Sequence, residues 1–124
     1  MKIASFNING IKARIQLLKE WLKKENPDII GLQELKSDNS NLNKNMFADL
    51  GYSFAYNGQK SYNGCGILSK YEIKNTSYFF NGIQEDPQKR WISAEINGIL
   101  ICNLYLPNGN PLGTEKFEYK IHWM

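Results

Sequence analysis

An amphipathic helix between two short apolar strands is the feature that most limits how this chain can fold. Apolar residues recur at helical spacing over residues 11–22, and the Asn-Pro pair at 26–27 ends the helix. Apolar runs at residues 2–7 and 28–34 flank it. A strand, a helix and a strand of these lengths favour a parallel crossover, which brings both strand ends to the same edge of one sheet.

Each of these two predicted strands ends in an oxygen-bearing side chain. Asn7 closes the first strand and Glu34 closes the second. The carboxylate of Glu34 offers the anionic oxygen that Mg²⁺ prefers, and the side-chain carbonyl of Asn7 offers a neutral ligand or a group that orients the carboxylate. Taken alone, a Glu at a strand end is more often a solvated terminus or an ion-pair partner, so the pattern leaves both interpretations open.

Short strands follow from residue 52 onward. Asn-Gly pairs occur between them, and this punctuation is typical of antiparallel hairpins. The sharpest turn prediction is Asn97-Gly98, because both central positions of a tight primed turn need positive φ. The predicted strands are residues 52–57, 65–69, 72–80, 90–96 and 99–106.

Two more helices are predicted from local signals. Residues 44–50 are expected to form a short helix that Gly51 closes. A last helix begins near Thr114 and presents one apolar face, made of Phe117, Ile121 and Met124. The chain shows no internal repeat, linker or low-complexity tract, so we predict one α/β unit.

Composition agrees with one globular unit. The 124 residues are 42% hydrophobic and 13% aromatic, which suffices for a core and excludes a disordered chain. The net charge of +3 permits contact with a polyanion without requiring it. Cys65 and Cys102 lie in apolar runs without metal-ligand spacing, so we predict buried free thiols in a reducing compartment.

The chain carries no predicted membrane segment. Met1 leads directly into a strand, and no apolar run approaches the ~20 residues of a membrane span. We therefore expect a cytoplasmic protein without membrane contact.

A third polar cluster is expected where the last predicted strand ends. Alternation along this strand places Asn103 and Tyr105 on one face together with Ile99 and Ile101. A phenol at this position can hydrogen-bond a phosphate oxygen. The alternative is a tyrosine that caps the core with its hydroxyl in water, which is the commoner situation for an isolated Tyr.

Four segments combine into a more specific pattern. They are Ser5-Phe6-Asn7-Ile8-Asn9-Gly10, Gly31-Leu32-Gln33-Glu34-Leu35-Lys36, the Gly58-Gln59-Lys60 loop, and Tyr105-Leu106-Pro107-Asn108-Gly109. This combination resembles the exonuclease III family, within the endonuclease/exonuclease/phosphatase group. The resemblance implies the N-terminal half of a four-layer α/β sandwich, in which this chain carries mainly one mixed β-sheet with covering helices.

The resemblance also implies roles for individual residues. Asn7 and Glu34 would hold Mg²⁺, with Mn²⁺ as an alternative, and Tyr105 would be an active-site residue that contacts the phosphate. Residues expected to approach the DNA backbone are Lys12, Gly58, Lys60, Arg90 and Asn108. Lys and Arg suit this task because neutralising phosphates releases counterions. Singly, each of these charges is also consistent with an ordinary solvated surface.

The activity implied by the resemblance is Mg²⁺-dependent hydrolysis of DNA phosphodiesters. Such enzymes act in DNA repair as 3′ to 5′ exonucleases and as endonucleases at abasic sites, so the expected partner is double-stranded DNA with abasic sites or 3′ ends. The family's later Gly-Asp-x-Asn, Asp and Ser-Asp-His motifs have no counterpart in this sequence, and His122 lies in the wrong place to replace them.

We therefore expect residues 1–124 to form a truncated domain without its C-terminal half, inactive as an isolated chain. One alternative is a non-catalytic DNA-binding or subunit-like half that needs a separately encoded C-terminal half. Another is a decayed gene product. We also expect a bare apolar floor beside the site, made of Ile3, Ile30, Leu32, Ile99 and Ile101, so that the isolated chain aggregates or dimerises.

Overall fold

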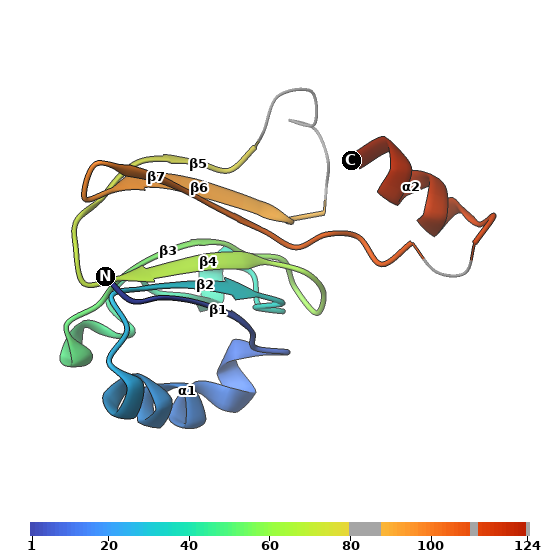
Figure 1. The fold of residues 1–124 in the computed structure, drawn as a ribbon. Coiled ribbons are helices and arrows are strands. Elements are labelled where there is room, and N and C mark those ends of the chain that lie inside the picture. Colours follow the sequence, from blue (N-terminus) through green and yellow to red (C-terminus); the bar gives the residue numbers. More distant parts are fainter. Residues whose placement is uncertain (80–87, 110–111, 124) are drawn as a thin grey trace.

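The structure, a computed structural model, describes residues 1–79, 88–109 and 112–123. Its elements form three layers (Figure 1). Helix α1 (Ile11–Glu25) covers one face of a four-stranded sheet, and a three-stranded sheet lies on the other face. Helix α2 (Glu115–Trp123) lies beyond the ends of the strands. Neither helix in this described part of the chain has the length and apolar character of a membrane span.

The four-stranded sheet is mixed, as predicted. Its order is β1-β2-β4-β3, with β1 parallel to β2 and the other pairs antiparallel. The strands are β1 (Ile3–Asn7), β2 (Ile29–Gln33), β3 (Ser53–Asn57) and β4 (Cys65–Ser69). Helix α1 connects β1 to β2, which confirms the predicted parallel crossover, and the backbone N–H of Asn26 closes the helix on Leu22.

The sequence predicted mainly one mixed sheet, whereas the structure contains a second, separate sheet of three strands. Its strands are β5 (Ile73–Ser77), β6 (Trp91–Ile96) and β7 (Ile99–Leu104), all antiparallel in the order β5-β6-β7. Asn97 and Gly98 connect β6 to β7 with φ of 52° and 76°, which confirms the predicted primed turn. These later strands pair with one another instead of extending the first sheet. The pair Asn81-Gly82, one of the Asn-Gly pairs between the predicted strands, lies outside the described residues.

Two hydrophobic cores hold the layers together. The first lies between α1 and the four-stranded sheet and includes Leu18, Leu22, Ile30, Leu32, Phe47 and Phe54. The second lies between the two sheets and is made of Ile29, Cys65, Ile67, Ile92, Ala94 and Ile96. The prediction that Ile30 and Leu32 form a bare floor is therefore wrong. Alternation along β2 was correct, but the face that carries these two residues is buried under α1.

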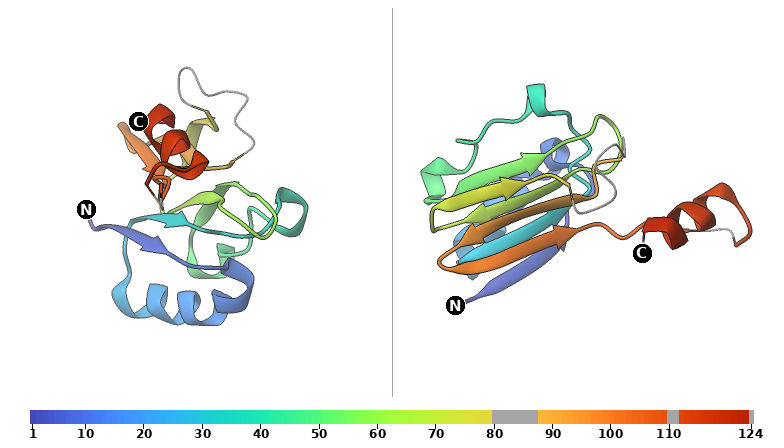
Figure 2. Two further views of the ribbon diagram at one scale, coloured as in Figure 1. Left: turned by 90° about the vertical axis from the view of Figure 1, so that its right-hand side faces the viewer. Right: turned by 90° about the horizontal axis from the view of Figure 1, so that it is seen from above.

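One margin of the two sheets is open. Strands β1 and β7 are edge strands, and β7 packs on β2 (Figures 1 and 2). Ile3 on β1 and Ile99 on β7 are both exposed, as are Leu100 and Leu104 on β7. Ile101, in contrast, packs against the core between the sheets. The predicted apolar floor is thus reduced to this open margin, which we define by Ile3, Ile99, Leu100 and Leu104.

The predicted helix at residues 44–50 is instead a set of turns. Two short 3₁₀ helices, Asn39–Asn41 and Ala48–Leu50, occupy this region, and Gly51 closes the second with a positive φ of 84°. The side chain of Asn43 accepts the backbone N–H of Asn45 at 2.8 Å, and such local bonds compete with helix formation. The final helix was predicted correctly, although Met124 of its expected apolar face lies outside the described residues.

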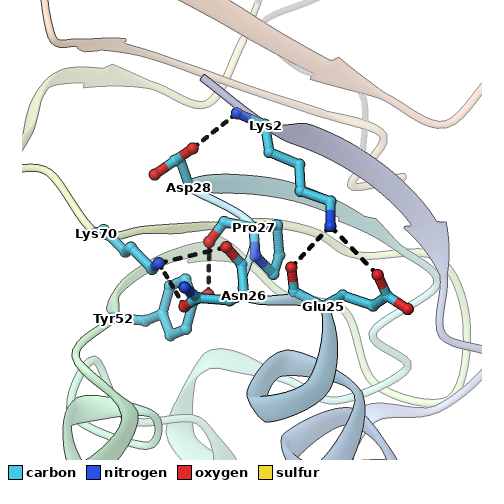
Figure 3. A network of polar contacts seen from close by, with 7 residues as sticks. All are labelled: Lys2, Glu25, Asn26, Pro27, Asp28, Tyr52 and Lys70. Carbon is cyan, nitrogen blue, oxygen red and sulfur yellow. Dashed lines mark hydrogen bonds and ion pairs between the residues drawn. The ribbon is translucent and has the colours of Figure 1, made fainter.

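A polar network fixes the start of β2 (Figure 3). The backbone N–H of Lys2 donates to Asp28 at 2.7 Å, and its ammonium bonds Glu25. The hydroxyl of Tyr52 donates to the carbonyl of Pro27 at 2.5 Å, and Lys70 bonds Asn26. This network, which we call the anchor, ties β1, α1, β2 and β4 together at the end of β2 that lies away from Glu34.

The two cysteines differ in environment. Cys65 is buried between the sheets, and burial raises the pKa of its thiol to about 12. Cys102 is exposed, so the prediction that both thiols are buried is wrong for this residue. Cys102 alternates with the inward-facing Asn103 along β7, and its side of the strand is not covered.

Candidate metal and phosphate site

The ends of β1 and β2 meet as predicted. Asn7, the last residue of β1, pairs with Gln33, the last residue of β2, and Glu34 follows directly. The side-chain carbonyl of Asn7 accepts the backbone N–H of Asn9 at 3.1 Å. Glu34 has a positive φ of 57°, so it leaves the strand and does not continue the alternation of β2. Asn7 and Glu34 therefore belong to one polar corner of the first sheet.

Glu34 faces both a phenol and an ammonium group. The hydroxyl of Tyr105 donates a hydrogen bond to Oε1 of Glu34. Lys36 Nζ lies 4.0 Å from Oε2 of the same carboxylate, whose side chain is 20% exposed. Lys36 also donates to the side-chain oxygen of Asn9 at 2.6 Å. The contact between Glu34 and Tyr105 joins the segment after β2 to the segment after β7.

Lys36 is a residue of this site that the sequence interpretation missed. It lies in the motif that contains Glu34, two positions further on, and both residues have positive φ, at 53° and 57°. Asn9, the partner of Lys36, has a φ of 47°. The sequence offered one signal for Lys36, namely that it lies two positions after Glu34 at the end of a predicted strand.

Arg90 contacts both the ring and the backbone carbonyl of Tyr105. Its guanidinium lies 4.9 Å from the centre of the Tyr105 ring and 5.5 Å from that of Tyr119. Nη1 of Arg90 donates to the carbonyl of Tyr105 at 3.2 Å, and Nε donates to Gln88 at 2.9 Å. The sequence interpretation assigned Arg90 to the DNA backbone, and the structure adds these contacts with Tyr105 itself.

Asn108 shares a cavity with Arg90. Both residues line a cavity of about 480 Å³ between the end of β7 and α2. The other lining residues are Gln88, Pro107, Gly109, Glu115, Lys116 and Tyr119. Lys116 places a second basic side chain in this cavity, and sequence reasoning gave it no role.

Gly58 fits closely inside the protein. A Cβ at this position would lie 2.3 Å from the backbone oxygen of Ser37, and the N–H of Gly58 donates to the side chain of Asn39 at 2.7 Å. Its lack of a side chain therefore lets the two loops pack together, whereas the sequence interpretation invoked an approach to DNA. Lys60 in the same loop and Lys12 in the first turn of α1 are both exposed.

The donor set suits a magnesium ion that also binds water or substrate. Among the residues that the structure describes, no three His, Cys, Asp or Glu side chains gather as they would around a metal held by protein alone. Mg²⁺ characteristically uses one or two carboxylates and keeps several waters or phosphate oxygens. Glu34 with the amide oxygen of Asn7 meets this requirement.

Burial and the bond to Glu34 raise the pKa of the Tyr105 phenol above its ordinary value of 10.0, with burial the larger cause. The folded state therefore favours the neutral phenol. The stability that this preference contributes is complete below about pH 10 and is lost as pH rises through the folded-state pKa.

We predict that Tyr105→Phe makes the free energy of unfolding less dependent on pH above about pH 10. Urea unfolding at a series of pH values measures this dependence. Tyr62→Phe, at an exposed tyrosine, is the matched control and should behave like the unaltered chain. An identical pH dependence for Tyr105→Phe and the unaltered chain would contradict the prediction.

The fold and this site together define a class of protein. Residues 4–122 match the model of the endonuclease/exonuclease/phosphatase family, and the chain belongs to that family. The chain is 39% identical to the exodeoxyribonuclease III of Haemophilus influenzae over 97% of its own length and 47% of the relative. It is 33% identical to a DNA-(apurinic or apyrimidinic site) endonuclease of Dictyostelium discoideum, over 98% of this chain and 34% of that one.

A solved structure agrees with these relatives. A 3′ phosphatase from Neisseria bound to a product DNA hairpin superposes with a TM-score of 0.94 and 34% identity, over 99% of this chain and 48% of that one. The fold is thus the N-terminal half of the family's α/β sandwich. The chain spans about half the length of this solved structure and of the Haemophilus relative, and about a third of the length of the Dictyostelium relative.

Proposed function

We propose that this chain supplies the metal-binding and phosphate-contacting part of a Mg²⁺-dependent DNA-repair nuclease. The observation that carries the proposal is the hydrogen bond from Tyr105 to Glu34, made where β1 and β2 end beside Asn7. One relative is an exodeoxyribonuclease III and another is an endonuclease of apurinic or apyrimidinic sites in DNA. These relatives support DNA with abasic sites or 3′ ends as the substrate. The reaction would be hydrolysis of a phosphodiester by 3′ to 5′ exonuclease and abasic-site endonuclease activity.

Each residue of the site has a proposed task. Glu34 and Asn7 would hold Mg²⁺ or Mn²⁺, which supplies Lewis-acid polarisation of the phosphate. Tyr105 would turn its hydroxyl from Glu34 to a phosphate oxygen when the metal occupies the carboxylate, and it would donate a hydrogen bond there. Its raised pKa keeps the phenol neutral. Arg90 would orient Tyr105 by the contacts with its ring and carbonyl.

The DNA backbone would pass over the basic and polar residues around this corner. Lys12 and Lys60 are exposed and would neutralise phosphates, while Arg90 and Asn108 would contribute from the cavity beside α2. Gly58 would act by fixing the loop that carries Lys60. We place the protein in the cytoplasm, in agreement with two free cysteines.

We also propose that residues 1–124 form one half of a domain, completed by a second polypeptide segment. Two observations favour this organisation. The chain covers 47% of the Haemophilus relative, and the margin formed by β1 and β7 exposes unpaired strand edges. A non-catalytic, subunit-like half that needs such a partner is therefore the second candidate.

Binding of Mn²⁺ tests the proposed metal site directly. In isotope-labelled protein, the paramagnetic ion should broaden the backbone signals of Asn7 and Glu34 first. Glu34→Gln keeps the shape of the side chain and should abolish this broadening, whereas Glu72→Gln, at an exposed carboxylate, should preserve it. Equal broadening in the Glu34→Gln variant would overturn the metal assignment.

Binding to a DNA duplex should be weak, non-specific and sensitive to salt. Substituting Lys12 and Lys60 by Ala should lower the slope of log K against log salt by about 2, because each phosphate contact contributes about 0.9. Fluorescence anisotropy at several salt concentrations measures the slope. Lys23→Ala with Lys24→Ala removes the same charge from the last turn of α1, and this control should leave the slope unchanged.

A further inference from the structure

A buried amide lies directly beneath the contact between Glu34 and Tyr105. Asn103 of β7 is 6% exposed and reaches from the second sheet into the first. Its Nδ2 donates to the backbone carbonyls of Leu32 at 2.8 Å and Gly66 at 2.7 Å. Its Oδ1 accepts a bond of 2.7 Å from Nε2 of Gln33. All three hydrogen bonds of this side chain thus cross from one sheet to the other.

The two sheets approach closely around this amide. A Cβ on Gly31 would lie 3.0 Å from Oδ1 and 3.1 Å from Cγ of Asn103, so the glycine makes room for the amide group. Elsewhere, the core between the sheets is built from apolar side chains such as Ile67 and Ile92. Another buried amide, Asn57 of β3, donates to the carbonyl of Trp91 on β6 at 2.9 Å. Apolar packing is not directional, whereas hydrogen bonds to fixed carbonyls are, so the bonds of Asn103 fix how β7 itself aligns on β2.

This alignment determines whether the site residues meet. Gln33 directly precedes Glu34, and Asn103 precedes Tyr105, the first residue after β7, by two positions. The bond between Gln33 and Asn103 and the bond between Glu34 and Tyr105 are therefore successive links between the same two segments. A shift of β7 along β2 would break both.

We propose that Asn103 is a positioning residue, whose amide fixes the alignment of β7 on β2 and thereby holds the hydroxyl of Tyr105 on Glu34. Gln33 extends this effect to β1, because its Nε2 also donates to Oγ of Ser5 at 3.1 Å. The strands that end in Asn7 and Glu34 are thus both linked to Asn103. The catalytic meaning of this arrangement rests on the proposed function, whereas the geometric role does not.

The contact between the Tyr105 ring and Glu34 reports this alignment, and the contact between Tyr52 and Pro27 provides an internal reference. The hydroxyl of Tyr105 bonds Glu34 across the two sheets, whereas that of Tyr52 bonds the carbonyl of Pro27. Tyr52 belongs to the anchor at the opposite end of β2 (Figure 3). General loosening of the fold would weaken both contacts, while a local shift of β7 would break only that of Tyr105.

The experiment measures NMR cross-peaks between the rings of labelled tyrosines and their neighbours in the whole chain at neutral pH. Tyr105→Phe and Tyr52→Phe assign the two sets of ring signals. In Asn103→Leu, which keeps the branched shape but removes the amide, the cross-peaks between Tyr105 and Glu34 should be lost while those between Tyr52 and Pro27 stay. Asn103→Thr retains one hydroxyl donor and should weaken the same cross-peaks to a smaller extent.

The outcomes separate the alternatives. Retained cross-peaks between Tyr105 and Glu34, or equal losses for Tyr105 and Tyr52, would overturn the positioning role. If Asn103→Leu does not fold, Asn103→Thr decides by the same comparison. The measurement uses neither metal nor DNA, so a positive result combined with Mn²⁺ binding that does not depend on Glu34 would retain the positioning role and reject the proposed function.

Discussion

Purified residues 1–124 should leave a duplex with an abasic site uncut in Mg²⁺, and adding a polypeptide that corresponds to the rest of the Haemophilus relative should produce cleavage. The described part of the chain offers Glu34 as the carboxylate of its site, and His122 lies exposed on α2. A missing general acid or base removes about 10²–10⁴ in rate, and each missing electrostatic contact removes about 10²–10³ more.

Gel analysis of an end-labelled duplex measures this activity. In the two-part mixture, Glu34→Ala should reduce cleavage by about 10² or more, because the proposed metal loses its anionic ligand. Glu72→Ala is the matched control at an exposed carboxylate and should retain full activity. Cleavage by the isolated chain that disappears with Glu34→Ala would contradict the view that this half is insufficient.

The isolated chain should self-associate through its open margin. Ile3, Ile99, Leu100 and Leu104 are between 42% and 65% exposed along two unpaired strand edges. Such edges and apolar patches are where chains pair with one another. Burying one Leu or Ile contributes about 1.5–3 kcal/mol. Replacing Ile3 and Leu100 by Lys should therefore weaken the association by about 100-fold or more.

Sedimentation velocity over a range of concentrations tests this expectation. Leu112→Lys changes an equally apolar residue that is 76% exposed but lies outside both edge strands, and it should leave the association intact. A chain that remains monomeric at every concentration would show that the margin does not drive assembly. Adding the complementary polypeptide should suppress self-association, because both compete for the same edges.

Local patterns were sufficient to predict the elements that bring the strand ends together. The spacing of apolar residues located α1, the pair Asn26-Pro27 located its end, and the crossover followed from chain length alone. The turn at Asn97-Gly98 was predictable because only a few residues tolerate two successive positive φ values. These signals are short in range, so each could be recognised within a few residues.

What could not be predicted depends on contacts between distant segments. Alternation along β2 defines two faces, but it does not say which face α1 covers, and this produced the error about Ile30 and Leu32. The bonds of Asn103 with Gln33 and Leu32 join residues about 70 positions apart. Nor does any local pattern reveal that Gly58 packs against Ser37.

The positive φ values at the site have a consequence for protein engineering. Glu34 and Lys36 adopt the left-handed backbone conformation, which is rare for residues other than glycine. Each such residue lowers the free energy of unfolding by about 1–3 kcal/mol. The backbone strain at this end of the sheet therefore lowers the stability of the fold while it places the side chain of Glu34. Substitutions that relieve the strain would tend to displace this carboxylate. The anchor around Tyr52 and Lys70 contains one such residue, Asn26 with a φ of 50°, and asparagine adopts this conformation more readily than Glu or Lys. A more heat-resistant variant is best sought there, where improved packing leaves the chemistry untouched.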